Sequence, residues 1–228
     1  MSNPTAFDHF ASDYDATVQA AIGASGESVT YFAELKARLA RAEAPARTQR
    51  VLDFGCGIGN TTRALASVFP AARIFGSDPS SDSISVARSR SADNLEFAQS
   101  DDTRLPFDDA SFDLTIAACV FHHIDGSQHE RWAREIARVL RPGGRFVLFE
   151  HNPLNPLTQR VVQNIPFDAG VVLLTRGEVR QLLESVGLRV RGSRFYFFFP
   201  RFLSALRRFE RLLAWLPFGG QFYVVGER

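Results

Sequence analysis

The sequence predicts an α/β protein with one doubly wound sheet of seven strands, mostly parallel, whose last strand is antiparallel. Three observations lead to this fold class. Short apolar runs alternate with helical patterns from Arg50 onward, which is typical of a parallel sheet with helices on its faces. A glycine-rich turn directly follows the first of these runs. The chain reaches its last apolar run through Gly219-Gly220, where it turns back.

The composition of the chain limits the classes of protein to which it can belong. Apolar residues make up 45% of the 228 residues and charged residues 22%, as in globular proteins large enough for one core. The net charge of +1 gives no overall attraction to nucleic acid, and we expect none as a partner. The start lacks the pattern of a secretory signal, and no apolar stretch approaches the roughly 18 residues of a spanning helix. Two cysteines suit a reducing compartment, so we expect a cytoplasmic protein with no disulfide scaffold and no metal site.

Residues 50–150 are expected to supply five strands. An amphipathic helix over about 27–43 carries Phe32, Leu35 and Leu39 at helical spacing, and Pro45 ends it. Strands are expected at 50–54, 73–77, 95–99, 112–119 and 144–150, with helices between them at 59–69, 81–91 and 127–140.

Local signals are expected to fix several of these helix ends. Ser127 and Glu130 have the spacing of a capping box that would begin the third helix, and Pro142-Gly143-Gly144 would stop it. After a proline-rich stretch, a second capping box, Thr175 to Glu178, opens a helix that ends at Gly187. An aromatic strand near 188–199, a helix near 201–216 and a strand near 221–226 complete the chain.

The stretch "VLDFGCGIGNTT", residues 51–62, places a glycine loop at the carboxyl edge of the sheet, where open α/β sheets bind ligands. Gly55 and Gly57 let backbone N–H groups come close to a ligand, and the helix after Asn60 offers a partly positive end. A dinucleotide fingerprint would require glycine where Asn60 stands. Asp53 would repel a pyrophosphate but attract a ligand with a cationic centre.

This stretch resembles the first motif of the class I S-adenosylmethionine (SAM)-dependent methyltransferases, in particular the group with the ubiquinone and menaquinone C-methyltransferases. The resemblance covers residues 50–150, because "IFGSDPS", "FAQSDDTRLPF", "FDDASFDLTIAACVFHHI" and "VLRPGGRFVLFE" follow in the family's order. The opening "FDHFASDYD" matches more loosely. The resemblance implies a Rossmann-like fold with SAM as the cofactor and S-adenosylhomocysteine as its product.

The resemblance also implies roles for single residues. Asp78 would accept hydrogen bonds from the ribose hydroxyls, and Pro79, which departs from the family pattern, would stack on the adenine. Asp101 would meet the adenine amino group, with the backbone N–H of Asp102 beside it. Tyr14 would lie over the cofactor.

The predicted cofactor site joins these residues to the glycine loop. Asp53 lies inside the first strand, and Asp78 and Asp101 follow the next two. Three acids at one sheet edge are costly unless a ligand donates to them. The alternative for Asp53 is a buried acid that caps a neighbouring loop. Cys56 fills the loop, and Cys119 leaves the fourth strand; neither thiol has an evident base partner for catalysis. The full set is Tyr14, Asp53, Gly55, Cys56, Gly57, Asp78, Pro79, Asp101, Asp102 and Cys119.

Two histidines are candidates for the catalytic base. Methyl transfer from a sulfonium depends mainly on positioning, and a neutral histidine can deprotonate a hydroxyl or an acidic carbon. His123 ends the fourth strand and His151 follows the fifth, with Glu150 able to orient either. His122 adjoins His123, so at most one of the two is expected to face the pocket. The alternatives are that these rings only hold a loop, and that proximity alone drives the reaction.

The N-terminal segment around Tyr14 and the stretch 152–175 would close over the pocket and select the acceptor. "FYFFFPRF" reads as a core strand, with an acceptor pocket as the alternative. The basic amphipathic helix at 201–216 would pack on the sheet, with peripheral membrane contact as the alternative. We therefore expect one domain over 1–228, with a helical lid at 1–49, a SAM-binding core at 50–151 and an acceptor side at 152–228.

The expected function is methyl transfer to oxygen or carbon of a small or lipid-like acceptor. Nitrogen methylation, a protein acceptor and a non-catalytic module that binds SAM or its product all stay open. A nicotinamide-dependent oxidoreductase is disfavoured by Asn60 and Asp53. The sequence predicts no oligomeric state.

Overall fold

The computed structural model describes residues 11–90, 92–101, 103–168 and 170–228 and confirms the seven-stranded sheet. The strand order is β3-β2-β1-β4-β5-β7-β6, and β7 is antiparallel to both of its neighbours. The direction of winding reverses between β1 and β4, which places the ligand crevice of this fold class there. The strands are β1 (Arg50–Phe54), β2 (Arg73–Asp78), β3 (Leu95–Gln99), β4 (Phe112–Ala118), β5 (Leu140–His151), β6 (Arg189–Tyr196) and β7 (Gln221–Glu227).

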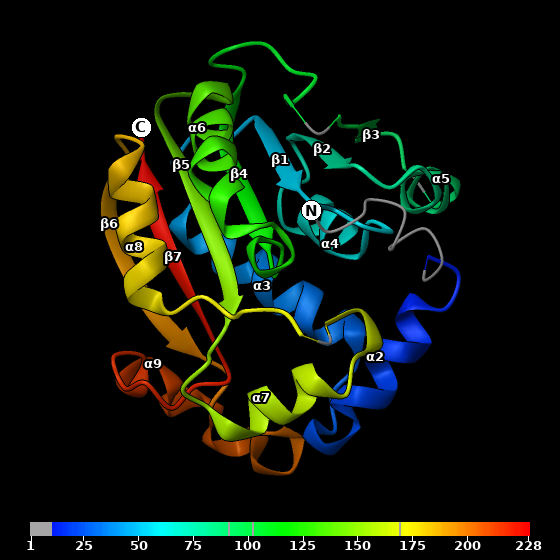
Figure 1. The fold of residues 1–228 in the computed structure, drawn as a ribbon, viewed down its shortest axis with the longest axis vertical. Coiled ribbons are helices and arrows are strands. Elements are labelled where there is room, and N and C mark those ends of the chain that lie inside the picture. The colour runs from blue at the N-terminus through cyan, green and yellow to red at the C-terminus, as the bar shows by residue number, and fades with distance from the viewer. Residues whose placement is uncertain (1–10, 91, 102, 169) are drawn as a thin grey trace.

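Helices cover both faces of the sheet (Figure 1). On one face, α3 (Val29–Glu43), α4 (Asn60–Val68) and α5 (Ser81–Ser89) contribute to one apolar core, and on the other α6 (His129–Val139) and α8 (Arg176–Ser185) contribute to a second. Successive side chains of a strand point to opposite faces, so Val51 enters the first core and Leu52 the second.

Two further helices lie at the carboxyl edge. In Figure 1, α2 (Tyr14–Ile22) and α7 (Pro156–Gln163) lie below the ends of the strands, on the side to which the parallel strands point. The short 3₁₀ helix η4 (Pro166–Asp168) follows α7. Asn155 caps α7, because its side chain accepts from the backbone N–H groups of Leu157 and Thr158. These elements enclose the space next to the glycine loop.

The structure confirms one of the predicted helix starts and contradicts another. The capping box from Thr175 to Glu178 is confirmed at the start of α8. The box at Ser127 is wrong, because the Asp125 side chain accepts from Ser127 N and forms a 3₁₀ turn before α6 begins at His129. The chain also passes from α6 directly into β5 at Leu140, so Pro142-Gly143-Gly144 lies within the strand.

The segment at 201–216 is not one amphipathic helix packed on the sheet. It forms a 3₁₀ segment η5 (Arg201–Phe209), with non-helical dihedral angles at Leu203, followed by the short helix α9 (Glu210–Leu213). No residue of η5 is buried. The predicted core packing of this segment is therefore wrong.

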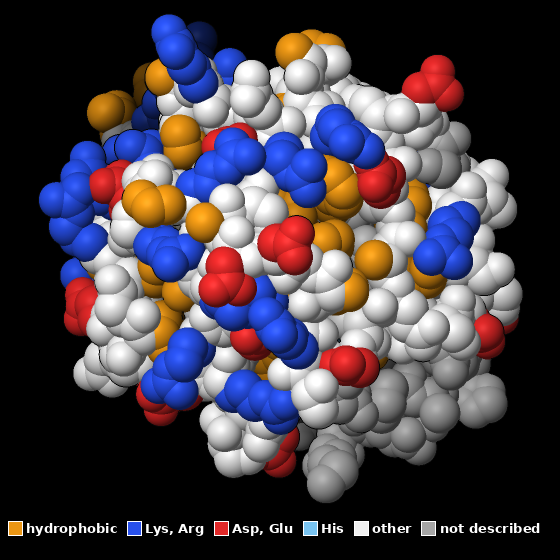
Figure 2. Space-filling model, turned by 90° about the horizontal axis from the view of Figure 1, so that it is seen from above, with side chains coloured by type: hydrophobic (Ala, Val, Ile, Leu, Met, Phe, Trp, Pro, Cys, Tyr) orange, Lys and Arg blue, Asp and Glu red, His pale blue; other side chains and the backbone are white. Residues whose placement is uncertain are grey.

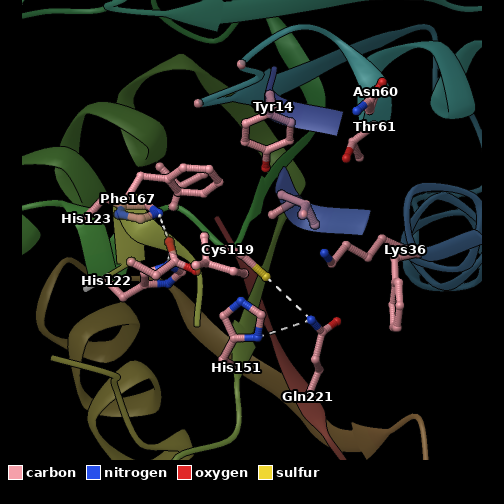
Figure 3. Close-up of a pocket in the computed structure, with 18 of the residues that line it drawn as sticks. Tyr14, Lys36, Asn60, Thr61, Cys119, His122, His123, His151, Phe167 and Gln221 are labelled. Carbon is pink, nitrogen blue, oxygen red and sulfur yellow. Dashed lines mark hydrogen bonds and ion pairs between the residues drawn. The ribbon is translucent and has the colours of Figure 1, made fainter. Parts of the chain in front are cut away.

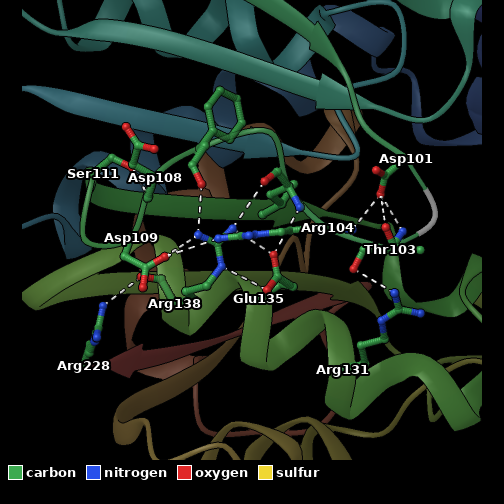
Figure 4. A network of polar contacts seen from close by, with 12 residues as sticks. Asp101, Thr103, Arg104, Asp108, Asp109, Ser111, Arg131, Glu135, Arg138 and Arg228 are labelled. Carbon is green, nitrogen blue, oxygen red and sulfur yellow. Dashed lines mark hydrogen bonds and ion pairs between the residues drawn. The ribbon is translucent and has the colours of Figure 1, made fainter.

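The loop after β3 is held from below by α6 (Figure 4). Arg138 donates to the carbonyl oxygens of Leu105 and Phe107 and forms ion pairs with Asp109 and Glu135. Arg131 Nη2 donates to the Thr103 carbonyl oxygen at 2.7 Å. Arginine's planar group of donors suits such multiple contacts, and here they fix the loop that carries Asp101.

Candidate active site

One large cavity occupies the carboxyl edge of the sheet. Its volume is about 1290 Å³, and it is lined by the loops after β1, β2, β3, β4 and β5 together with α2, α3 and α7. Ligand pockets usually measure about 300–1,000 Å³, so this cavity has room for a nucleoside cofactor and a second molecule.

The glycine loop needs its glycines for two reasons. Gly55, Gly57 and Gly59 have φ values of +69°, +51° and +81°, which favour residues without a Cβ. A Cβ on Gly55 would lie 2.6 Å from the side chain of Val120, whereas a Cβ on Gly57 would meet no atom within 4 Å. Gly57 lines the cavity, so a ligand can approach its backbone there.

Asp78 and Asp101 both line the cavity. Asp78 Oδ2 accepts from Gly57 N at 2.8 Å, which joins the end of β2 to the glycine loop, and Pro79 lies beside it in the lining. Asp101 Oδ1 accepts from the hydroxyl of Thr103 and from the N–H groups of Thr103 and Arg104, each at 2.7 Å. These bonds, first of all the one from the Thr103 hydroxyl, lower the pKa of Asp101. Asp102 lies outside the described residues.

Asp53 lies behind the loop and does not line the cavity, which corrects the expectation of direct ligand contact. Its Oδ2 accepts from the hydroxyl of Thr62 in α4 at 2.7 Å. Its Oδ1 is buried without a hydrogen-bond partner among the described residues, and burial raises the pKa of Asp53 to about 7. Asp53 therefore anchors α4 from inside the core.

Tyr14, the first residue of α2, lines the cavity. Its ring stacks on Phe167 of η4 with 5.2 Å between ring centroids, and Figure 3 shows its hydroxyl pointing into the pocket. Asp15 Oδ1 accepts from Asn60 Nδ2 at 2.7 Å, which ties α2 to the first residue of α4. The segment around Tyr14 and the stretch 152–175, both expected over the pocket, therefore meet at the contact between Tyr14 and Phe167.

His122 and His123 both line the cavity, so the expectation that at most one of them faces it is wrong. The reason is that Phe121–His123 forms a 3₁₀ turn and not a continuation of β4, so the alternation of a strand does not apply. The two ring centroids are 4.1 Å apart, and the His151 ring lies 5.3 Å from that of His122 (Figure 3).

Glu150 orients His122 and not the two histidines proposed from the sequence. Its Oε2 lies 2.6 Å from His122 Nδ1, while its Oε1 accepts from Phe121 N at 2.9 Å. Both side chains are almost fully buried. Burial opposes a charge on His122, but Glu150 outweighs it and raises the pKa of His122. The pKa of Glu150 is lowered in turn, because His122 outweighs the effect of burial.

Asp168 of η4 meets both adjacent histidines. Its Oδ1 lies 3.2 Å from His123 Nε2 and 3.9 Å from His122 Nε2. These three atoms all lie within 4.8 Å of one another, a spacing at which they could share a metal ion as well as a proton. Burial lowers the pKa of His123 although Asp168 opposes the shift.

His151 belongs to a second group with Gln221 and Cys119. Gln221 Nε2 lies 3.3 Å from His151 Nδ1 and donates to Cys119 Sγ at 3.8 Å. Burial lowers the pKa of His151 and raises the pKa of both Cys119 and Cys56, so neither thiol is an activated nucleophile. Both cysteines are free thiols.

Several lining residues were missed by the sequence analysis. Lys36 of α3 is buried and extends into the cavity (Figure 3), whereas the sequence analysis considered only the apolar residues of this helix. Asp168 lies in the stretch expected to close the pocket, but no motif marks it. Phe197 and Phe198 follow β6 and line the cavity, while Phe195 and Tyr196 are core residues, so both interpretations of "FYFFFPRF" hold in part.

Comparison with known proteins agrees with this geometry. Residues 51–144 match the family model described as "Methyltransferase domain". The chain is 37% identical to the demethylmenaquinone methyltransferase of Clavibacter sepedonicus over 53% of this chain and 49% of that protein. It is 33% identical to the fatty-acid O-methyltransferase of Mycolicibacterium smegmatis over 75% of this chain and 65% of that one. The chain thus spans about half to two thirds of the length of these relatives.

Solved structures share the fold over nearly the whole chain. A methyltransferase of Haloferax volcanii, solved in complex with the Trm112 methyltransferase activator, superposes with a TM-score of 0.69 at 25% identity, covering 97% of this chain and 96% of that one. A SAM-dependent methyltransferase of Mesorhizobium loti gives 0.62 at 22% identity over 84% and 96%. The glycine loop, the acid that ends β2 and these matches together show that the chain belongs to the class I SAM-dependent methyltransferases.

Proposed function

We propose that the protein transfers a methyl group from SAM to an oxygen or carbon atom of a small, lipid-like acceptor. The observation that carries this proposal is one continuous cavity that brings the glycine loop and Asp78 together with three histidines and an apolar lining. In this account the chain up to residue 49 acts as a lid, 50–151 binds the cofactor, and 152–228 forms the acceptor side of the same domain.

The glycine-loop end of the cavity fits the cofactor. Gly57 faces open space, and the Asp78 carboxylate stands at the end of β2 with oxygens suited to ribose hydroxyls. Gly55 and Cys56 would lie along the cofactor, Pro79 and Asp101 at its adenine, and Tyr14 over it. When bound, SAM supplies a methyl group on a positively charged sulfur.

His123 is the proposed base, with His151 as the second candidate. Burial lowers the pKa of both rings, so both are neutral near pH 7 and able to accept a proton from a hydroxyl or an acidic carbon. Asp168 would stabilise the charged ring of His123 after it has taken the proton. Closure by Tyr14 and Phe167 would exclude water from this centre.

The opposite wall suits an apolar acceptor. Phe32 and Phe197 line the cavity with their ring centroids 4.8 Å apart, and Val29 and Ile165 extend the same lining. Two similar proteins are named for quinone precursors and fatty acids, which supports an acceptor of this chemical class.

Incubation with methyl-labelled SAM and fractionated lipid extract tests the proposal. We expect label in an apolar product, and loss of most of that product in the double variant H123A/H151A. Unchanged turnover in that variant would overturn the assignment of a base and leave positioning as the source of catalysis. SAM that is bound but never consumed with any fraction would show a non-catalytic binding module.

A further inference from the structure

Exposed apolar side chains are concentrated in two segments that are far apart in the sequence. Of the ten large apolar residues exposed in the described part of the chain, nine lie within 154–157 and 202–218. Phe202 is 80% exposed and Trp215 71%, and Leu154, Leu157, Leu212 and Phe218 are similarly open. Contiguous apolar exposure of this kind marks an interaction surface.

These segments lie side by side and form one surface. Asn155 Nδ2 donates to the Phe218 carbonyl oxygen at 2.8 Å, and Thr158 Oγ1 donates to that of Gly220 at 2.9 Å. Asn152 Nδ2 donates to the carbonyl oxygen of Pro217 at 2.9 Å. Figure 1 shows α7, α9 and the orange segment η5 together at the lower end of the molecule. We call the surface formed by 154–160 and 201–218 the mouth face.

The mouth face is continuous with the inside of the cavity. Leu157 of α7 and Phe202 of η5 are both strongly exposed and both line the cavity. Further in, Phe197 and Phe198 continue the apolar wall towards the centre of the site. Apolar side chains therefore line the cavity from this surface inwards.

The charge of the mouth face is positive. Residues 201–218 hold Arg201, Arg207, Arg208 and Arg211 against a single acid, Glu210, although the whole chain has a net charge of only +1. Arg207 pairs with Glu27, but no ion pair joins the other three arginines to an acid among the described residues. α7 adds the exposed Arg160.

The end of the molecule opposite the mouth face differs from it in the distribution of charge. Figure 2 shows basic and acidic side chains interspersed on the face seen from above. Near the start of β5, Arg141 pairs with Asp113 at 2.8 Å and Arg145 with Glu227 at 3.2 Å. The excess of arginine over acid within residues 201–218 contrasts with the mixed charges of that face.

We propose that the mouth face docks on an anionic lipid bilayer and admits the acceptor directly from it. Aromatic and aliphatic side chains among arginines suit the boundary between headgroups and acyl chains, where the aromatic rings insert and the guanidinium groups contact phosphates. Within the described ranges, none of the helices has the length and hydropathy of a membrane-spanning segment. The route for the acceptor rests on the proposed function, whereas the docking does not.

Co-sedimentation with phosphatidylcholine vesicles, with and without phosphatidylglycerol, tests the proposal. We expect binding to the anionic vesicles, with at least a tenfold loss in the variant F202S/L212S/W215S and a comparable loss in R208E/R211E. The control R134E/R180E reverses two exposed arginines on α6 and α8 and should bind as the wild type does. Trp215 fluorescence should shift to the blue on binding, and Trp215→Phe should abolish that shift although Trp132 remains.

Three results would overturn the docking proposal. In the first, the wild type does not bind anionic vesicles. In the second, the mouth-face variants bind as well as the control does. In the third, the wild type self-associates without lipid whereas F202S/L212S/W215S is monomeric. The last would assign the face to a second copy of the chain. Labelling with methyl-labelled SAM and detergent-dispersed lipid extract separates the two proposals, because failure of docking leaves this transfer intact, whereas failure of the proposed function abolishes it while vesicle binding persists.

Discussion

His122 Nδ1 and Glu150 Oε2 lie 2.6 Å apart, with both side chains almost fully removed from solvent. The pair fixes the 3₁₀ turn that carries His123, because Glu150 also accepts from the backbone of Phe121. A buried ion pair that loses one partner leaves an uncompensated charge, whose cost is much larger than the net contribution of the intact pair.

Glu150→Gln should therefore destabilise the protein by about 3–5 kcal/mol. The raised pKa of His122 contributes stability that is fully present below the unfolded value near 6.5 and is lost as the pH rises through the folded value. Denaturant unfolding from pH 6 to 9 should show this loss in the wild type and not in the variant. Parallel curves for the two proteins would contradict the account.

Asp53→Asn should remove a different pH dependence. Because burial raises the pKa of Asp53 to about 7, the folded state binds the extra proton, and stability should fall as the pH rises from about 4 to 7. A shift of about three units sets an upper limit of ~4 kcal/mol for this loss. The variant should show a flatter stability curve over that range, and an unchanged curve would mean that Asp53 is ionised in the native protein.

Asp168→Asn should lower kcat about tenfold to a hundredfold and leave the affinity for SAM unchanged. The lowered pKa of His123 predicts that the wild-type rate falls as the pH drops below a value under 6.5. The variant should move that inflection to still lower pH, since Asp168 favours the charged ring. A purely structural role would leave the inflection in place. Inactivation by a chelator, reversed by added metal, would instead assign the cluster to a metal ion.

Gly57→Ala should weaken SAM binding more than it weakens folding. The φ value of +51° makes alanine cost about 1 kcal/mol, and the new Cβ would occupy the open space beside the loop. Calorimetry should show at least a tenfold loss of SAM affinity. Gly143→Ala, at φ +77° inside β5 and outside the lining, is the matched control and should bind SAM normally.

Much of the sheet could be predicted because buried parallel strands leave a plain trace in the sequence. The apolar runs at β1 and β3 match the expected bounds, and Asp78 lies at the end of β2 where the motif places it. The capping prediction at Ser127 was wrong because Asp125 caps this turn instead, its side chain accepting from the backbone N–H of Ser127. The sequence pattern alone does not show which of the two residues forms the cap.

The site was harder to predict than the sheet. Asp53 points to the same face of β1 as Val51, towards α4, and strand alternation alone could have indicated this. That both His122 and His123 line the cavity depends on a 3₁₀ turn that no residue pattern indicates. The apolar spacing in residues 201–216 indicates that one side of the segment is apolar. It does not distinguish packing against the sheet from exposure at the molecular surface.

Calorimetric titration with SAM of the wild type, Asp78→Ala and the control Asp82→Ala is the most direct test of the central claim, that the glycine loop and Asp78 hold this cofactor. We predict one SAM per chain for the wild type and the control, at least a hundredfold weaker binding for Asp78→Ala, and no heat with NADH. Equal SAM affinity in all three proteins, or saturable binding of NADH in place of SAM, would contradict it.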